Sequence, residues 1–155
     1  MIKSIWELFN KEDLFECYQC ARCTGSCPAA MAINSYGPRE ILLRCLNLGQ
    51  EAVVGDERIW YCTTCNVCED RCPQEINIPE LLTAIFNLAA QRGNLPEKIK
   101  FGVDLIAKTG RSLIINDKVL KERQKLALPA LDPLNIDEIE GILKKTGLNE
   151  EIELS

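Results

Sequence analysis

The chain has 155 residues, of which 46% are hydrophobic, 26% charged and 6% aromatic, and this composition is typical of a globular protein rather than a disordered or fibrous one. Nine cysteines without a histidine exclude Ser-His-Asp triads, HExxH zinc sites, Rieske centres and CxxCH haem attachment. The net charge of −5 argues against nucleic-acid binding, and no apolar run resembles a signal peptide or reaches the roughly 18 residues that span a bilayer, so we expect a cytoplasmic protein without membrane insertion.

Apolar residues recur with a helical period along most of the chain, which predicts an all-α fold. In chain order, Ser4 and Glu7 match a capping box that opens a short N-terminal helix. Longer helices then begin at first-turn prolines or at acidic residues and end near glycines. No stretch alternates with period two for long enough to build a sheet, although Ser112–Asn116 is apolar enough to be extended. The predicted longer helices run from Pro38 to Gly49, from Pro79 to near Gly93, from Pro96 to Gly110, from Asp117 to Leu126 and from Asp137 to Thr146.

Cysteine content divides the chain into two parts. We expect a cofactor-binding domain over residues 1–95, followed by a cysteine-free helical extension over residues 96–155. Within the extension, Leu128–Asn135 carries two prolines and is typical of a linker. The extension has no motif of its own, so the residues leave two interpretations open: additional core packing, or a docking arm for a partner protein.

Eight of the nine cysteines form two copies of one pattern, C-x2-C-x2-C-x3-C-P. Every member of the second copy lies 45 residues after its counterpart. The flanks agree as well, because an aromatic precedes each copy and an Ile-Asn, a proline, a glutamate and an apolar pair follow it. The pattern indicates an internal duplication. The first motif is Cys17, Cys20, Cys23 and Cys27 with Pro28, and the second motif is Cys62, Cys65, Cys68 and Cys72 with Pro73.

This spacing resembles that of two-cluster ferredoxins, in which three cysteines hold one [4Fe–4S] cluster and the fourth, before a proline, reaches the other cluster. Gly25 is expected to permit a backbone conformation with room for N–H···S hydrogen bonds. Since the glycines form no GxGxxG or Walker loop, we expect no catalytic residue and no further cofactor site. The resemblance implies that Cys17, Cys20, Cys23 and Cys72 hold one cluster, and that Cys62, Cys65, Cys68 and Cys27 hold the other.

Other uses of these cysteines are weighed by context. Disulfides need an oxidising compartment, and zinc ribbons separate their CxxC pairs by a dozen or more residues, so both fit the spacing poorly. The ninth cysteine, Cys45, lies on an apolar helix face and is expected to be a buried core residue. Tyr18, Trp60 and Tyr61 stand beside the motifs and are expected to shield the clusters from water, although ordinary core packing gives the same pattern.

A full helix between the two motifs distinguishes the chain from bacterial-type ferredoxins. The duplicated motif with helical inserts resembles the α-helical ferredoxin fold of the iron–sulfur subunits of succinate dehydrogenase and related modules. Without a [2Fe–2S] domain or a Cys-Cys-Gly sequence, the chain is most similar to the family of C subunits of soluble heterodisulfide reductase. That resemblance covers nearly the whole chain, including Gly110-Arg111 and Lys145-Thr146-Gly147.

Membership of that family implies an electron-transfer subunit of an oxidoreductase with no substrate site of its own. The expected partners are heterodisulfide reductase subunits A and B, of which A carries flavin and B carries CCG domains. Single electrons would pass from the flavin subunit to the CCG-domain subunit, which reduces the disulfide CoM-S-S-CoB in methanogenesis. A hydrogenase or formate dehydrogenase is an expected further member of the complex. The alternatives are a free ferredoxin-like carrier, a relay subunit of a related sulfur-metabolism complex, and a structural module without redox traffic.

Overall fold

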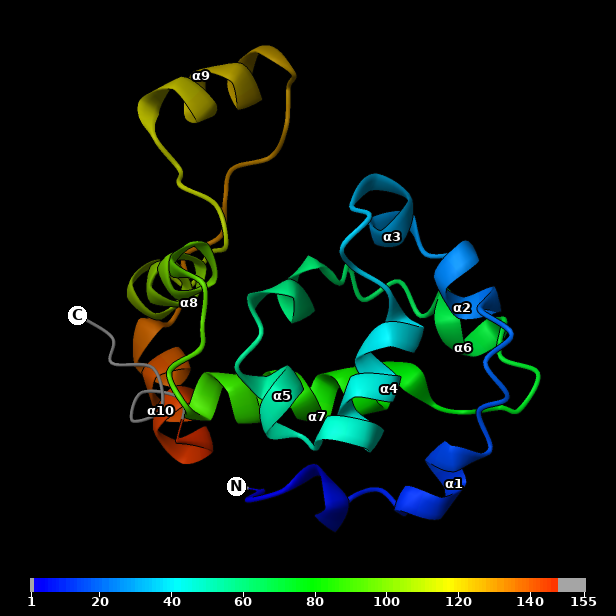
Figure 1. Ribbon diagram of the computed structural model, residues 1–155. Helices are drawn as coiled ribbons and strands as arrows, with labels where there is room; N and C mark the ends of the chain where they lie inside the picture. Colours follow the sequence, from blue (N-terminus) through cyan, green and yellow to red (C-terminus); the bar gives the residue numbers. More distant parts are fainter. Residues whose placement is uncertain (1, 148–155) are drawn as a thin grey trace. The chain divides into compact units, whose positions relative to one another are not determined.

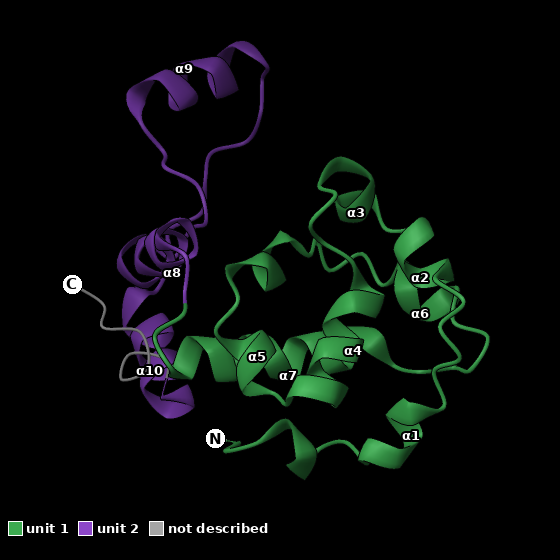
Figure 2. Cartoon of the chain, in the orientation of Figure 1, with its two compact units in different colours: residues 1–94 green, residues 95–155 purple. Residues whose placement is uncertain are grey.

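The computed structural model describes residues 2–147, and every regular element in that range is a helix. The absence of strands from these residues confirms the all-α prediction, and 112–116 is irregular rather than extended in a sheet. The chain forms two compact units, Met1–Asn94 and Leu95–Ser155 (Figure 2). Residues 148–155 of the expected extension lie outside the described range.

The first unit contains two long α-helices among several single-turn helices (Figure 1). The two long helices begin and end close to the prolines and glycines that predicted them. Of the single-turn helices only η1 was predicted, from its capping residues, because segments of three to five residues are too short to show a helical period. The elements are η1 (Ile5–Glu7), α1 (Lys11–Phe15), α2 (Arg22–Gly25), α3 (Pro28–Ala32), α4 (Pro38–Leu48), α5 (Glu51–Val54), η2 (Glu57–Tyr61), α6 (Val67–Asp70) and α7 (Ile78–Gln91).

Helix α7 forms the centre of the first unit and packs against η1, α5, α6 and η2. The Asn77 side chain accepts a hydrogen bond from the backbone N–H of Glu80 at 3.0 Å and caps its first turn, where Pro79 needs no partner. Apolar residues cover much of its circumference, as expected for a helix surrounded by other elements. Its buried residues are Ile78, Leu81, Leu82, Ala84, Ile85, Leu88 and Ala89.

Helix α4 begins at Pro38 and ends at Leu48. The next residue, Gly49, has a φ of 87°, which is incompatible with a right-handed helix and stops it there. It packs against α1, α2 and α5. The two motif helices therefore rest on different long helices: α2 contacts α4, and α6 contacts α7. Since α2 and α6 also contact each other, the duplication seen in the sequence brings the two cysteine motifs side by side.

The N-terminal capping prediction is correct for one partner only. The Ser4 hydroxyl accepts a hydrogen bond from the Trp6 backbone N–H, as an N-cap does. The Glu7 carboxylate, however, accepts from the backbone N–H of Lys3 rather than that of Ser4. The Ser4 hydroxyl also donates to Gln50 at 2.8 Å, and this long-range contact ties the N-terminal segment to α5.

The second unit contains α8 (Glu97–Thr109), α9 (Asp117–Lys125) and α10 (Ile136–Thr146), each within a residue or two of its predicted bounds. Helix α8 packs on α10. Gly110 ends α8 with a φ of 67°, and a Cβ atom at this position would lie 2.6 Å from Ile139 and 2.8 Å from Leu134. Glycine is therefore required here both by its backbone conformation and by the close approach of α10.

Candidate metal centres

The two cysteine motifs have the same backbone conformation at matched positions. Gln19 and Ala21 in the first motif, and Thr64 and Asn66 in the second, are all left-handed, with φ between 52° and 66°. Both pairs are 45 residues apart, so the internal duplication extends to the backbone. Left-handed residues in tight loops turn N–H groups toward one side, an arrangement that binds anions and iron–sulfur groups. In the second motif, the Thr64 N–H donates to the Cys62 sulfur at 3.4 Å.

The prediction that Gly25 supplies this special conformation is wrong. Gly25 is the last residue of α2, and its φ does not lie in the left-handed region. Three of the left-handed positions fall on Gln19, Ala21 and Thr64, residues that incur a steric cost of about 1–2 kcal/mol each and carry no sequence signal for this conformation. The fourth is Asn66, a residue type that adopts it more readily. The second motif, which contains no glycine, therefore has the same loop conformation as the first.

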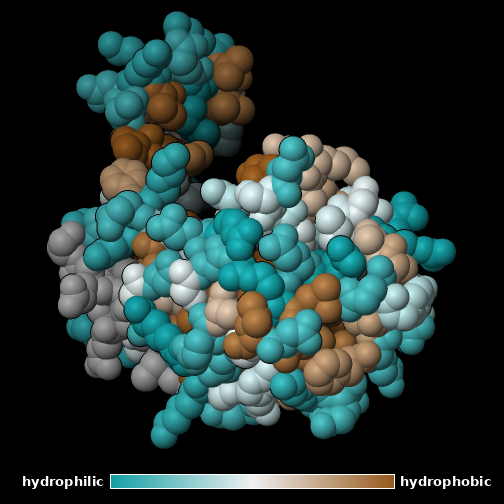
Figure 3. All heavy atoms as spheres, viewed as in Figure 1, coloured by the Kyte–Doolittle hydropathy of each residue, from teal (hydrophilic) through white to brown (hydrophobic). Residues whose placement is uncertain are grey.

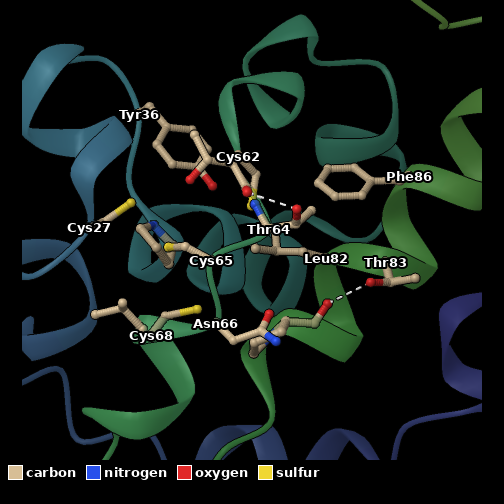
Figure 4. A pocket seen from close by; sticks show the side chains of 14 residues that line it. Cys27, Tyr36, Cys62, Thr64, Cys65, Asn66, Cys68, Leu82, Thr83 and Phe86 are labelled. Carbon is tan, nitrogen blue, oxygen red and sulfur yellow. Dashed lines mark hydrogen bonds between the residues drawn. The ribbon is translucent and has the colours of Figure 1, made fainter. Parts of the chain in front are cut away.

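One pocket contains cysteines from both motifs. Cys62, Cys65 and Cys68 line it together with Cys27, the last cysteine of the first motif (Figure 4). Cys27 and Cys68 are buried, Cys62 is half-buried and Cys65 is exposed. The other walls come from the segment before α4, from the first residue of α4 and from α7, and include Tyr36, Pro38, Pro79, Leu82 and Phe86. This arrangement brings together the four cysteines expected for the second cluster.

Around the first motif, the side chains of Cys17 and Cys20 are close enough to Cys23 that their charges raise the pKa of its thiol, although burial is the larger cause. Cys72 reaches the same region from the end of the second motif. Local desolvation, a hydrogen bond and charge interaction with Cys20, and the charge of Cys72 all raise the pKa of Tyr18. Cys20 and Cys72 are therefore both within electrostatic range of the Tyr18 hydroxyl group.

The thiols differ in how readily they ionise. Burial, followed by the charge of Cys62, raises the pKa of Cys68 to about 11. At the exposed Cys65, hydrogen bonding from the Val67 backbone N–H, assisted by Thr63, lowers the pKa instead. Metal coordination deprotonates a thiol outright, so a cationic centre held by the four sulfurs would compensate the desolvation of the buried ones. Within residues 2–147, no three Cys, Asp or Glu side chains are placed to hold a single metal ion.

The pocket of the second motif also contains an unpaired donor. The Tyr36 side chain is 3% exposed, and its buried hydroxyl group faces the Cys62 side chain but has no partner within hydrogen-bonding geometry. Burial is the main cause that raises the pKa of this hydroxyl, which keeps it protonated. Four convergent thiols and a buried O–H donor fit a group that carries both metal ions and anionic sulfur. The residues present therefore fit an iron–sulfur cluster.

Aromatic side chains do line the pocket of the second motif, but they are not the ones expected to shield the clusters from water. Tyr18 and Tyr61 are exposed by 55% and 42%, and neither they nor Trp60 line the pocket of the second motif. Tyr36 and Phe86 line it instead, and Trp60 stacks behind Phe86 with ring centres 5.1 Å apart. Sequence reasoning missed Tyr36 because it lies in an irregular segment outside both motifs.

Cys45 lies apart from both motifs, fully buried on α4 as predicted. Desolvation raises the pKa of its thiol to about 11, which is the behaviour of an inert core cysteine. Among the helices of the described residues, none has the length and apolar character needed to cross a membrane.

Residues 12–76 match the 4Fe-4S dicluster domain family, which confirms the predicted cofactors, two [4Fe–4S] clusters. The matched segment contains all eight motif cysteines.

The chain is also similar to curated proteins over most of its length. It is 35% identical to the iron-sulfur C 2 subunit of the CoB–CoM heterodisulfide reductase of Methanocaldococcus jannaschii, with 83% of this chain and 72% of the relative covered. It is 34% identical to the C2 subunit of the H2/formate:CoB-CoM heterodisulfide,ferredoxin reductase of Methanococcus maripaludis, with 88% and 77% covered. With the C subunit of the ferredoxin/F420H2-dependent CoB-CoM heterodisulfide reductase of Methanosarcina acetivorans, identity is 28% and coverage is 97% of both chains.

Proposed function

Because the chain belongs to the family of iron–sulfur C subunits of heterodisulfide reductase, we propose that it is the electron-relay component of such a complex. It takes single electrons from the flavin subunit and delivers them to the CCG-domain subunit, which reduces CoM-S-S-CoB in methanogenesis. Each [4Fe–4S] cluster, when bound, supplies a site that accepts and releases one electron. The disulfide chemistry takes place on the CCG-domain subunit, so this chain needs no substrate site, and its place of action is the cytoplasm.

The proposed ligands are crossed between the two motifs. Cys17, Cys20, Cys23 and Cys72 hold the first-motif cluster, and Cys62, Cys65, Cys68 and Cys27 hold the second-motif cluster. The observation that carries this assignment is the pocket that Cys27 shares with the second motif. The electrostatic influence of Cys72 on Tyr18, which also interacts with Cys20, supports the reciprocal half. Crossed ligation ties each motif to the cluster of the other, so that the two clusters are held as a pair.

The contact between the two cysteine motifs supports electron transfer from one cluster to the other. Cys23 on α2 is close enough to Cys68 on α6 that its charge raises the pKa of the Cys68 thiol. The two ligand sets therefore adjoin through buried residues, from which water is largely excluded. Each set also has one exposed cysteine, Cys20 in the first and Cys65 in the second. These exposed edges give a partner's cofactor access to each site.

The extension is the proposed docking arm for the flavin and CCG-domain subunits, and for a hydrogenase or formate dehydrogenase in the same assembly. Its surface carries large apolar side chains that nothing within the second unit covers, and Figure 3 shows hydrophobic surface in the region of α9. Exposed apolar patches of this kind mark protein–protein interaction sites. Around α9, the exposed members are Leu113 (71%), Leu126 (69%), Ile114 (57%), Leu128 (46%) and Leu120 (41%).

Reconstitution with the two partner proteins tests the proposal. The anaerobically loaded chain is expected to contain about eight irons and to be reversibly reduced. Mixed with the flavin and CCG-domain subunits, it should restore disulfide-dependent oxidation of the reduced flavin and elute with both in one complex on size exclusion. Equal rates with and without the chain would exclude the relay role. Restored rates without a stable complex would identify a free carrier instead.

A further inference from the structure

Tyr36 occupies the segment between α3 and α4, with its ring closed in on several sides. Its backbone N–H donates to the Ile33 carbonyl at 3.0 Å, which fixes the local turn. The ring meets Tyr61 edge-on, with centroids 6.3 Å apart and planes at 78°. At the next residue, Gly37, a Cβ atom would come within 3.0 Å of Thr24, so the backbone here is packed closely against the first motif. The Tyr36 side chain therefore has a fixed direction, toward the pocket of the second motif (Figure 4).

A buried hydroxyl without a partner is destabilising, and native proteins seldom contain one without a reason. Among the described residues, only two buried side-chain polar atoms lack a partner, the Tyr36 hydroxyl and one oxygen of Asp104. The other Asp104 oxygen is paired with Lys108, so that carboxylate is not isolated. Tyr36 alone has its single polar group unpaired, and the groups around that hydroxyl are the sulfurs of Cys62 and Cys27.

A phenol has one O–H donor, and thiolate and sulfide sulfurs are acceptors. We propose that Tyr36 donates an O–H···S hydrogen bond to the second-motif cluster, through the Cys62 thiolate or an adjoining sulfide, and thereby raises the reduction potential of that cluster. This inference rests on the proposed ligand assignment. The sign follows from charge: reduction adds a negative charge, and a donor stabilises the more negative form more strongly.

Only one of the two duplicated halves of the domain contains such a donor. After the motif the second copy is shorter: the three residues between Asn34 and Pro38, of which Tyr36 is the middle one, are matched only by Ile78, between Asn77 and Pro79. Ile78 is buried and its side chain has no polar atom. The tyrosine beside the first motif, Tyr18, is 55% exposed, and its hydroxyl can bond to water as well as to sulfur. A buried donor therefore acts on one cluster of the pair only, although the two sites have the same kind of ligands.

Tyr36→Phe removes the oxygen and leaves the ring. In an EPR-monitored redox titration of the loaded chain, we expect the second-motif cluster to become harder to reduce by about tenfold in equilibrium constant, or about 59 mV. The first-motif cluster, identified as the signal that survives in Cys27→Ser, should be unchanged. Tyr61→Phe is the matched control, because it alters a more exposed hydroxyl on the neighbouring ring and should shift neither potential. Unchanged potentials in Tyr36→Phe, or a shift of the first-motif cluster alone, would overturn the inference.

A second substitution covers the case in which Tyr36→Phe fails to retain its iron. Replacing Tyr36 by 3-fluorotyrosine makes the hydroxyl a stronger donor, so the second-motif potential should rise rather than fall. A potential that does not move, or moves downward, would contradict the hydrogen bond. These titrations use the isolated chain, so they are separate from the relay assay: absence of two reducible clusters in the unmodified chain refutes the proposed function, whereas two reducible clusters that ignore Tyr36 refute only this inference.

Discussion

Asp56 offers a direct test of how the structure positions the second motif. Its carboxylate precedes η2, the single turn that leads into Cys62, and accepts a hydrogen bond from the Arg58 backbone N–H at 2.9 Å. The same carboxylate pairs with the guanidinium groups of Arg58 and of Arg44 on α4. Those arginines also donate to the carbonyls of Ser35, at 3.1 Å, and Ala52, at 2.7 Å. One carboxylate therefore connects α4, α5, η2 and the segment that carries Tyr36.

Asp56→Asn keeps the size of the side chain and removes its charge. The side chains of Asp56, Arg44 and Arg58 are 13%, 24% and 35% exposed, so the network lies between a surface pair, worth up to about 1 kcal/mol, and a buried pair, whose breakage costs about 3–5 kcal/mol. After allowance for solvent screening, we expect a loss of about 2 kcal/mol in the free energy of unfolding at pH 7.

The pH dependence has a definite sign. Hydrogen bonds from Arg58, partly opposed by burial and reinforced by Arg44, hold the pKa of Asp56 well below its ordinary value of 3.8. A depressed pKa means that the stabilisation is fully present above the ordinary value and is lost as the pH falls toward the folded-state value. The difference in stability between the native chain and Asp56→Asn should therefore be constant near neutrality and shrink below about pH 4.5.

Urea unfolding of the cluster-loaded chain, followed by circular dichroism under anaerobic conditions, measures this difference. Glu57→Gln is the matched control, because it removes one negative charge from the exposed neighbouring residue and should change the stability by less than about 0.5 kcal/mol. A difference no larger for Asp56→Asn than for Glu57→Gln at pH 7, or one that grows on acidification, would refute the reasoning.

Three further predictions concern the ligands and the extension. Cys27→Ser should lower the iron content from about eight to about four by loss of the second-motif cluster, whereas Cys45→Ala should retain about eight; loss confined to the first-motif cluster would contradict the crossed ligation. Gly110→Ala should destabilise the second unit by about 2–4 kcal/mol, through its left-handed backbone and the contacts of the added Cβ, while Gly102→Ala within α8 should stabilise it by up to about 1 kcal/mol; hydrogen exchange of α8 and α10 measures both, and the reverse ranking would exclude this packing. Deletion of residues 95–155 should leave both clusters in place and abolish co-purification with the flavin and CCG-domain subunits, so an intact complex after the deletion would refute the docking arm.

The long helices could be predicted from the sequence because their signals are local. Prolines that open α4 and α7, glycines after their ends and apolar residues at helical spacing act through neighbours a few residues apart. The one-turn helices α2 and α6 have no such signal, because four residues show no period and packing against α4, α7 and each other stabilises them. The left-handed residues escaped prediction for the same reason: intrinsic preference would select Gly25, whereas the fold selects Gln19 and Ala21.

The candidate metal centres show the same division between what local sequence signals predict and what they do not. The eight motif cysteines are proposed as ligands from their spacing alone, since the chemistry of a thiolate-bound cluster fixes the residue type and its interval. The side chains that surround these cysteines could not be predicted from the sequence. Tyr36 reaches the pocket of the second motif only because the irregular segment before α4 passes over it, and no local pattern records that path. The same holds for Phe86, which belongs to α7 and would be taken for an ordinary core residue.

The surroundings decide how the two sites differ, because their ligands are the same. The second-motif set has two buried cysteines, Cys27 and Cys68, whereas only Cys23 is buried in the first set. Burial opposes the negative charge that reduction adds and so lowers the potential of the second-motif cluster, while a hydrogen bond from Tyr36 raises it. The two effects have opposite signs at the same site. A relay needs clusters close enough in potential for electrons to pass between them, and a buried donor at the more buried site is the arrangement that brings the two potentials together.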